Sequence, residues 1–193
     1  MVNHQYSKSL EFEADFREYV RMSLTNDIHY FSLLRPLSEL QIASVFAKNS
    51  SYFSDFRSCN VGSKTNIWCG KCSKCLFTFI ILSPFLKPKV LVDIFGYNLL
   101  ENSELKLFFD ELIGVADVKP FECVGTVDEV NIALCLTMAY YKDELPYLLN
   151  YYKNIRGENY CKSSAVNVDL SHLESEHFLE EKFLDLIKTK LND

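Results

Sequence analysis

The sequence predicts an α/β fold that is predominantly helical in this chain, and three observations lead to that prediction. Most segments repeat apolar residues at the helical period, and three begin with a capping box, Ser or Thr followed three residues later by Glu or Gln. The run IHYFSLL at 28–34 is a strand candidate that ends before Pro36, and two or three strands are expected at most. Four cysteines between 59 and 75 predict a metal-bound knuckle. The length fits a single domain over 1–193.

Two helices and the strand candidate are expected before the cysteines. The first helix is predicted over 10–22, where large apolar side chains recur on one face. After the strand candidate 28–34, a capping box formed by Ser38 and Gln41 predicts a helix that runs to about Lys48. The residues expected to face inward from that helix are Ile42, Val45 and Phe46.

After the cysteines, the pattern predicts a series of helices that are separated by Gly, Pro and polar loops. The first begins at Cys75 and is apolar on nearly every side, which is typical of a buried helix. The remaining helices are expected over 90–95, over 103–113 with Ser103 as its cap, over 126–141 behind a capping box of Thr126 and Glu129, over 146–156, and from a third capping box of Ser171 and Glu174 to the end. Loops are expected at 115–125 and 158–169.

Composition and charge exclude several classes of protein. With 48% hydrophobic and 14% aromatic residues, the chain can fill a core without disulfides. A net charge of −6 does not favour a nucleic-acid surface, which usually needs a basic face. The lysines at 64, 71 and 74 form a local basic cluster, which we interpret as charge balance for the nearby thiolates.

The sequence shows no sign of secretion or of a membrane segment. No charged and apolar leader with a cleavage site opens the chain. The longest apolar run, 76–86, is interrupted and falls short of the ~20 residues that a membrane span needs. Seven cysteines, an odd number with four of them grouped, fit a reducing compartment better than a disulfide framework. We therefore expect a cytoplasmic protein.

The four grouped cysteines are Cys59, Cys69, Cys72 and Cys75, and the last three form C-x2-C-x2-C. Four thiolates in so short a span can enclose one Zn²⁺ at Zn–S distances of about 2.3 Å, so we predict a structural zinc site. Unbound thiols are the alternative interpretation. A redox C-x-x-C motif fits less well, because it requires a βαβ context and has no use for four cysteines.

Two other motifs do not support a known chemistry. Gly62-Ser63-Lys64-Thr65 has some likeness to a phosphate-binding loop, but it lacks the glycine spacing that lets successive N–H groups surround a phosphate. The four histidines are scattered, and no H-E-x-x-H motif is present. Nothing in the sequence itself therefore names an ATP site.

Taken together, six blocks of this sequence resemble the C-terminal portion of the bacterial UDP-N-acetylmuramoyl-L-alanyl-L-glutamate epimerases. In order, they are NHQYSKSLEFE, YFSLLRPLSELQIA, FRSCN, WCGKCSKCLF, IFGYNLL and KPFECVGT, spread over residues 3–126. The cysteine spacing is also similar to the zinc site of 7-cyano-7-deazaguanine synthases, which belong to the PP-loop ATP pyrophosphatases. The resemblance implies the C-terminal part of a PP-loop fold.

The resemblance also implies a reaction, an isomerisation in peptidoglycan precursor synthesis for the cell wall. Members of the family convert the terminal L-Glu of UDP-MurNAc-L-Ala-L-Glu to D-Glu. They consume ATP, which is expected to bind together with Mg²⁺. Adenylating the carboxylate removes its negative charge, so that a side chain can take the α-proton and a donor can stabilise the enolate.

One part of the family pattern is absent from residues 1–193, the S-G-G-x-D-S type PP-loop. We therefore expect an incomplete enzyme that lacks the ATP-binding half and is inactive alone. It would be a fragment, a truncated product, or one subunit of a split PP-loop enzyme with a separate ATP-binding chain. The alternative function is a non-catalytic zinc-knuckle module that binds a partner.

The family-like blocks contain the other candidate site residues. Cys123, beside Glu122 in KPFECVGT, is a candidate for acid–base work if a nearby cation such as Lys119 lowers its pKa. In the alternatives, Glu122 is the base, or Cys123 is a small buried residue that closes a loop. Lys8, Arg35 and Arg57 are candidates for binding substrate carboxylate or phosphate, and structural ion pairs are the alternative.

Overall fold

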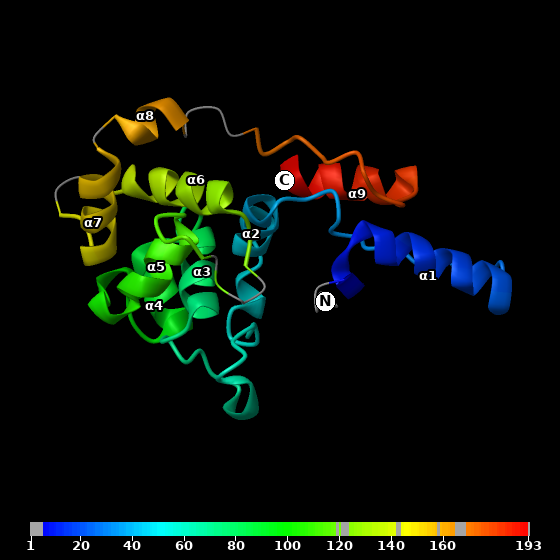
Figure 1. Cartoon of the computed structure of the whole chain (residues 1–193), viewed down its shortest axis with the longest axis horizontal. Helices are drawn as coiled ribbons and strands as arrows, with labels where there is room; N and C mark the ends of the chain where they lie inside the picture. The colour runs from blue at the N-terminus through cyan, green and yellow to red at the C-terminus, as the bar shows by residue number, and fades with distance from the viewer. Residues whose placement is uncertain are drawn as a thin grey trace. The chain divides into compact units, whose positions relative to one another are not determined.

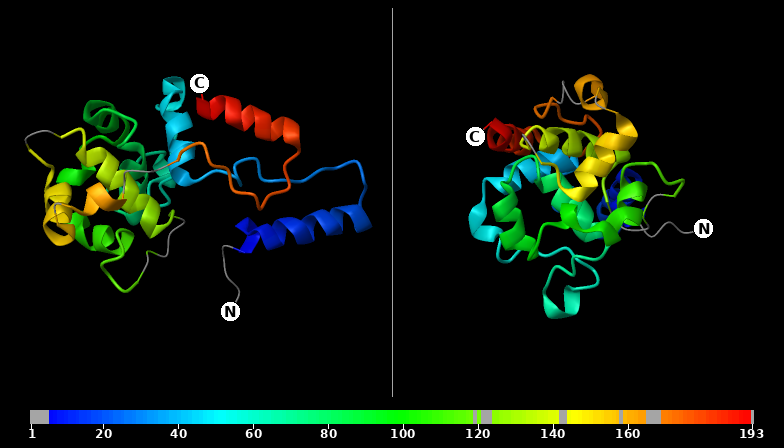
Figure 2. Two further views of the ribbon diagram at one scale, coloured as in Figure 1. Left: turned by 90° about the horizontal axis from the view of Figure 1, so that it is seen from above. Right: turned by 90° about the vertical axis from the view of Figure 1, so that its left-hand side faces the viewer.

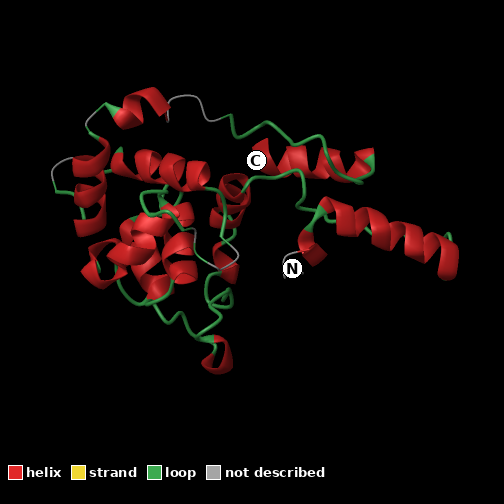
Figure 3. Cartoon of the chain, viewed as in Figure 1, coloured by secondary structure: helices red, strands yellow, loops and turns green. Residues whose placement is uncertain are grey.

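The structure is a computed structural model that describes residues 6–118, 120, 124–141, 144–157, 159–164 and 169–192. These residues form helices and loops and contain no strand, as Figure 3 shows. The predominantly helical character that the sequence predicts is thus confirmed. No helix in the described ranges is long and apolar enough to cross a membrane. The chain divides into two compact units, Met1–Ser38 with Leu170–Asp193, and Glu39–Asp169.

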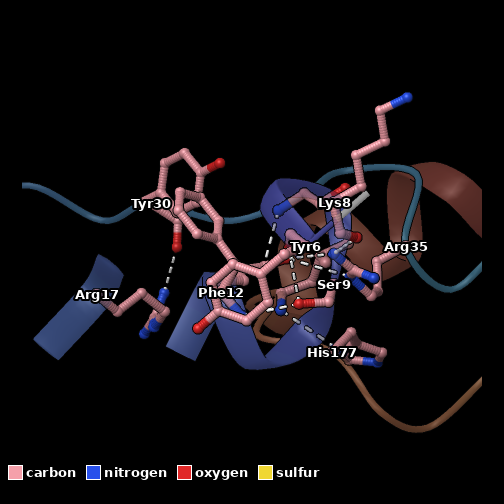
Figure 4. Close-up of polar contacts among 11 residues, drawn as sticks. Tyr6, Lys8, Ser9, Phe12, Arg17, Tyr30, Arg35 and His177 are labelled. Atoms are coloured by element: carbon pink, nitrogen blue, oxygen red, sulfur yellow. Dashed lines mark hydrogen bonds and ion pairs between the residues drawn. The ribbon is translucent and has the colours of Figure 1, made fainter. Parts of the chain in front are cut away.

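In the first unit, helix α1 (Leu10–Ser23) follows the short 3-10 helix η1 (Tyr6–Lys8). The Ser9 hydroxyl accepts the N–H of Phe12 at 3.0 Å and so caps α1, which confirms the helix expected over 10–22 (Figure 4). The inner face of α1 carries the buried carboxylate of Glu13. That carboxylate accepts hydrogen bonds from the Arg35 guanidinium at 3.1 Å and from the Ser32 N–H at 3.0 Å.

The strand expected over 28–34 is absent. The chain from Ile28 to Phe31 has no regular structure, and turns follow it up to Pro36. Its polar backbone groups are bonded by side chains of α1, since Arg17 donates to the Tyr30 carbonyl at 2.6 Å and Glu13 accepts the Ser32 N–H. These bonds satisfy backbone groups that a strand would offer to a neighbour.

The terminal helix begins later than the sequence predicts. Helix α9 spans Glu181–Asn192, whereas the capping box of Ser171 and Glu174 places its start ten residues earlier. The N–H of Glu174 donates to the Pro36 carbonyl at 2.9 Å and is therefore not donated to the hydroxyl of Ser171, as the capping box would require. Contacts within the unit instead fix this segment to α1, because the Arg17 guanidinium lies 4.8 Å from the centre of the Phe178 ring.

In the second unit, helix α3 (Ser73–Leu82) forms the centre of the core, as expected for a helix that is apolar all round. Only Lys74 and Thr78 of its ten residues are not buried. Helices α2 (Glu39–Ala47), α5 (Lys106–Leu112) and α6 (Val127–Met138) pack against α3 (Figure 1). Helix α4 (Pro88–Phe95) also contacts it and ends at Gly96, whose φ of +92° is left-handed.

The remaining helices of the second unit follow in chain order. Helix α7 (Tyr147–Arg156) begins after Pro146, and α8 (Tyr160–Ser164) comes next, yellow to orange in Figures 1 and 2. Four 3-10 turns complete the unit: η2 (Ser50–Tyr52), η3 (Ser63–Thr65), η4 (Leu99–Glu101) and η5 (Ser103–Leu105). The turn η3 lies in a loop that protrudes from the unit.

Four expectations for this unit need correction. The polar stretch 158–169 contains α8, and Asn102 caps η5 in place of Ser103, through its side-chain oxygen and the Glu104 N–H. On α2 the buried residues are Leu40, Gln41 and Ala43, whereas Ile42, Val45 and Phe46 are half-buried. A disulfide joins Cys135 of α6 to Cys161 of α8, which the cysteine count did not predict.

The capping box of Thr126 and Glu129 is confirmed. The Thr126 hydroxyl accepts the N–H of Glu129 at 3.2 Å, and the Glu129 carboxylate accepts the N–H of Thr126 at 2.9 Å. The same carboxylate accepts the N–H of Glu39, the first residue of α2, at 2.7 Å. One side chain therefore caps two helices.

Candidate functional site

The four cysteines of the predicted knuckle come together in the second unit. Cys59 follows the loop after η2, Cys69 and Cys72 lie in the turn before α3, and Cys75 is in the first turn of α3. Their sulfur atoms all lie within 4.8 Å of one another. The shorter separations are 3.5 Å for Cys72–Cys75, 3.6 Å for Cys69–Cys75 and 3.9 Å for Cys59–Cys72. These four residues can hold one metal ion.

The sulfur positions fit the geometry of a tetrahedral thiolate site. Four sulfurs at about 2.3 Å from a central zinc ion would be separated from one another by about 3.8 Å. The three shorter separations, 3.5–3.9 Å, lie around that value, and all the others are within 4.8 Å. Cys59, Cys72 and Cys75 are buried and Cys69 is half-buried, so the centre is largely removed from solvent.

Backbone N–H groups stabilise negative charge on three of the sulfurs. The N–H of Gly62 points to Cys59 at 3.2 Å, that of Lys71 to Cys69 at 3.4 Å, and that of Cys75 to Cys72 at 3.4 Å. The last of these makes Cys72 the N-cap of α3. The knuckle is therefore built into the start of the most buried helix, as the sequence predicts.

Gly70 is required by the turn between Cys69 and Cys72. Its φ is +64°, in the left-handed region, and a Cβ at this position would overlap the hydroxyl of Tyr97. Burial, followed by the negative charges of Cys69 and Cys75, raises the pKa of Tyr97. Its phenol therefore stays protonated beside the thiolates and closes one side of the knuckle.

The thiols influence one another strongly. The hydrogen bond from Cys75 lowers the pKa of Cys72 to about 5, and the same bond raises the pKa of Cys75. Burial raises the pKa of Cys69. One sulfur of the cluster thus ionises at neutral pH while its neighbour keeps its proton, and a bound cation would favour ionisation of all four.

Beside the cysteine centre lies a pocket of about 280 Å³ between α2 and α3. Its walls are mostly apolar, and Glu39 and Lys74 supply the only charged side chains among its lining residues. The remaining lining residues are Ile42, Ala43, Phe46, Phe56, Ser58, Phe77, Thr78, Ile81 and Leu82. Phe56 also packs on Trp68, with ring centres 5.2 Å apart, so the pocket and the knuckle share a wall.

Glu39 lies at the point where three elements of this unit meet. Its backbone N–H is capped by Glu129, and the backbone of Gly125 lies close to its side chain, since a Cβ on Gly125 would be 3.1 Å from the Glu39 Cγ and 3.0 Å from Phe77. Burial raises the pKa of Glu39, the charge of Glu129 raises it further, and Lys74 opposes this rise. Sequence reasoning missed Glu39. In the sequence it is only a residue between the ends of the capping box formed by Ser38 and Gln41.

The predicted acid–base residues cannot be placed. Glu122, Cys123 and the nearby Lys119 lie outside the described residues. The described chain resumes at Val124 and Gly125, and Gly125 lies against Glu39 and Phe77 of the pocket rim.

The predicted substrate-binding residues differ in what surrounds them. Arg35 pairs with the buried Glu13 and donates to the Lys8 carbonyl at 2.9 Å, and Lys8 itself lies at the end of η1 with an exposed side chain (Figure 4). Arg57 lies two residues before Cys59 and donates to the Phe56 carbonyl at 2.6 Å. Its Nε is buried without a hydrogen-bond partner.

The profile described as the MurL C-terminal domain matches residues 53–156, which include all four clustered cysteines and the loop before α6. The profile described as the MurL N-terminal domain matches residues 1–33. No solved structure matches.

Three similar curated proteins carry the name UDP-N-acetyl-alpha-D-muramoyl-L-alanyl-L-glutamate epimerase. The protein of Xanthomonas oryzae pv. oryzae is 45% identical over 141 residues, which are 70% of this chain and 31% of that protein. Those of a Micromonospora species and of Salinispora tropica are 42% and 41% identical over 139 residues, again 70% of this chain and 31% and 30% of theirs. This chain thus spans about a third of the length of these relatives.

Proposed function

Because this chain belongs to the MurL family, we propose that it is the C-terminal segment of an ATP-dependent epimerase that acts on UDP-MurNAc-L-Ala-L-Glu. The observation that carries the proposal is the match of the MurL C-terminal domain over more than half of the chain, together with relatives that are named for this reaction. The product would be the D-Glu form of the peptidoglycan precursor, made in the cytoplasm.

The chemistry of the substrate explains the need for ATP. A proton on the carbon next to a carboxylate is very weakly acidic, because its removal would add a second negative charge. In the proposed reaction, ATP converts the carboxylate to an acyl-adenylate and releases pyrophosphate. A base then takes the α-proton, a donor stabilises the enolate, and a proton returns to the opposite face. ATP and its Mg²⁺ would be bound by a PP-loop portion that residues 1–193 do not contain.

In this proposal the cysteine centre holds one Zn²⁺ in a structural role. Cys59, Cys69, Cys72 and Cys75 would complete a shell of four thiolates, which leaves no position open for water or substrate. The ion would supply no chemistry to the reaction. Its effect would be to fix the first turn of α3 and the position of Lys74 beside the pocket.

The remaining candidate residues keep distinct proposed roles. Glu122 and Cys123 are proposed for proton transfer. Lys8 and Arg57 are proposed to bind the anionic groups of the substrate, and the orphaned Nε of Arg57 supports a further hydrogen bond at that side chain. For Arg35, the ion pair with buried Glu13 favours a role in holding the first unit together.

The proposal is tested by supplying the missing portion. Purified 1–193 is expected to release no pyrophosphate from ATP with UDP-MurNAc-L-Ala-L-Glu. The N-terminal part of the Xanthomonas oryzae relative, fused upstream or added as a separate chain, is expected to restore both pyrophosphate release and formation of D-Glu, measured by chiral chromatography after hydrolysis.

Two controls make this experiment decisive. The N-terminal part alone must be inactive, and the restored enzyme must lose D-Glu formation when Glu122 and Cys123 are both replaced by Ala. Pyrophosphate release by 1–193 alone would contradict the proposed absence of an ATP site. A fused protein that binds ATP but forms no D-Glu would contradict the proposed reaction.

A further inference from the structure

The pocket between α2 and α3 has a composition typical of a site for a small ligand. Apolar side chains from both helices form its walls, and the hydroxyls of Ser58 and Thr78 with the charged groups of Glu39 and Lys74 are the polar features of its lining. Its volume of about 280 Å³ is near the lower end of ligand pockets, which start at roughly 300 Å³. A group the size of a dipeptide fits this space, whereas a nucleotide sugar does not.

The charged groups of Glu39 and Lys74 do not stabilise the fold of the described residues through hydrogen bonds or ion pairs. Within the described part of the chain, neither the Glu39 carboxylate nor the Lys74 ammonium forms a hydrogen bond or an ion pair, although the two side chains are close enough to influence each other. Lys74 is half-buried, and Glu39 lies at the exposed rim of the pocket. The neighbouring anion, Glu129, is occupied by the N–H groups of Glu39 and Thr126. Lys74 is therefore the group at this rim that can pair with a ligand carboxylate.

We propose that this pocket binds the terminal glutamyl residue of the acyl-dipeptide substrate, with Lys74 paired to the γ-carboxylate and Glu39 facing the α-carbon. The inference rests on the proposed function, and it adds a substrate site and a second proton-transfer residue to it. The methyl group of the alanyl residue would lie against Phe46 and Phe77 in the apolar part of the pocket.

The proton balance of this arrangement is complete. In the activated substrate the α-carbon–hydrogen bond breaks, its proton moves to a carboxylate oxygen of Glu39, and its electron pair passes into the acyl carbonyl. A second group returns a proton to the opposite face of the carbon. Glu122 and Cys123, which are proposed above for proton transfer, are the candidates for that second group. Exchange with solvent then removes the proton from Glu39 and returns one to the second group.

The surroundings of Glu39 raise its pKa and so make its carboxylate a stronger base than that of an ordinary glutamate. The charged groups that face it are Glu129 from α6 and Lys74 from α3. Because its pKa is raised above the usual 4.5, Glu39 is uncharged over a wider range of acid pH than an unperturbed glutamate. As the pH rises through that raised pKa, the new negative charge repels an anionic ligand. Binding of a dicarboxylate should therefore weaken with increasing pH.

The single tryptophan provides the measurement. Trp68 is buried, and its ring packs on Phe56, which lines the pocket. The full chain is titrated with N-acetyl-L-Ala-L-Glu, and the fluorescence of Trp68 is followed. We expect a saturable change, and Lys74→Met, which keeps the apolar stem, should weaken the apparent affinity about 10-fold or more. Lys89→Met, an exposed lysine on α4, is the matched control and should leave the affinity unchanged.

The role of Glu39 is tested with Glu39→Gln. This variant should bind the probe with an affinity that no longer depends on pH above 4.5, whereas the matched control Glu11→Gln should retain the dependence. In the restored epimerase, Glu39→Gln should lower kcat by about 100-fold or more with a smaller change in KM, within the usual range for a lost acid–base group.

The outcomes separate this inference from the proposed function. The titration needs neither ATP nor turnover, so it stands even if the fused enzyme forms no D-Glu. Absence of a saturable fluorescence change, or wild-type affinity in a zinc-loaded and folded Lys74→Met variant, would overturn the binding site. A restored enzyme in which Glu39→Gln keeps full kcat would overturn the proton-transfer role. If Lys74→Met fails to fold, the pH profile of Glu39→Gln decides the binding question.

Discussion

Cys72 has two functions in the structure, as a member of the cysteine centre and as the N-cap of α3. The substitution Cys72→Ser separates them, because serine is a good N-cap but a poor zinc ligand. We expect the metal content of the purified chain to fall from about one zinc per chain to nearly none, and the free energy of unfolding to fall by about 4 kcal/mol or more. Elemental analysis and urea denaturation measure the two effects.

The matched control for this substitution is Cys161→Ser, which removes a sulfur outside the cluster. It should keep the zinc content. Equal zinc in the wild type and in Cys72→Ser would contradict the four-thiolate site, and the absorption spectrum of an iron–sulfur cluster would contradict the choice of metal.

Individual residues were predictable where their chemistry is local in the sequence. The spacing of the cysteines was enough to predict that Cys59, Cys69, Cys72 and Cys75 come together, because all four lie within one short stretch of the chain. Glu39 was not predictable, since its environment depends on Glu129, ninety residues further along the chain. The same holds for Arg35, whose partner Glu13 lies on a different element.

Glu129 connects two helices, and its removal should destabilise the start of each. Its carboxylate accepts the N–H groups of Thr126 and Glu39 and so caps α6 and α2. Glu129→Ala removes the protein acceptor of two N–H groups at exposed helix starts, and each lost cap costs about 1 kcal/mol. We expect a loss of about 2 kcal/mol in the free energy of unfolding, measured by urea denaturation.

Asp128→Ala is the control for this prediction. Asp128 is exposed in the same first turn of α6 and shares its favourable interaction with the helix dipole, so its loss should cost well under about 1 kcal/mol. Equal destabilisation by both substitutions would show that the dipole, and not the double cap, accounts for the effect.

At the scale of elements, sequence patterns succeeded where the cap is satisfied within one segment. The box at Thr126 formed, and the helix behind it ends within three residues of its predicted end. The box at Ser171 did not form, because the Glu174 N–H bonds to Pro36. The strand at 28–34 failed for a similar reason, since side chains from α1 take its backbone groups. Both failures involve partners distant in sequence.

For the whole molecule, metal removal should affect the two units differently. The cysteine centre and α3 belong to the second unit, whereas the first unit is stabilised by the buried pair of Glu13 and Arg35 and by ring contacts such as Phe31 with Phe183. After chelation, we expect hydrogen exchange in 73–82 to accelerate by at least about 100-fold, as expected for loss of a structural metal. Exchange in α1 should change little.

Mass spectrometry of peptides after hydrogen exchange measures this difference, and zinc added back provides the control. Equal acceleration in α1 and α3 would contradict separate stabilisation of the two units. No change in α3 would contradict the structural role proposed for the metal.

The overall architecture was predictable only in part. The helical character and the buried helix behind the cysteines were evident, because both follow from hydrophobic periodicity. The division of the chain into two units was not, since the segments that form the first unit lie at opposite ends of the sequence. Family resemblance predicted the MurL assignment, which the domain match then confirmed.

The disulfide between Cys135 and Cys161 has a topological consequence. It closes a covalent ring that contains the end of α6, the whole of α7 and the beginning of α8. A single break of the backbone inside that ring would open the circle without releasing either piece. The segment around α7 is therefore the one stretch of the described chain in which a cut by a protease leaves the polypeptide joined.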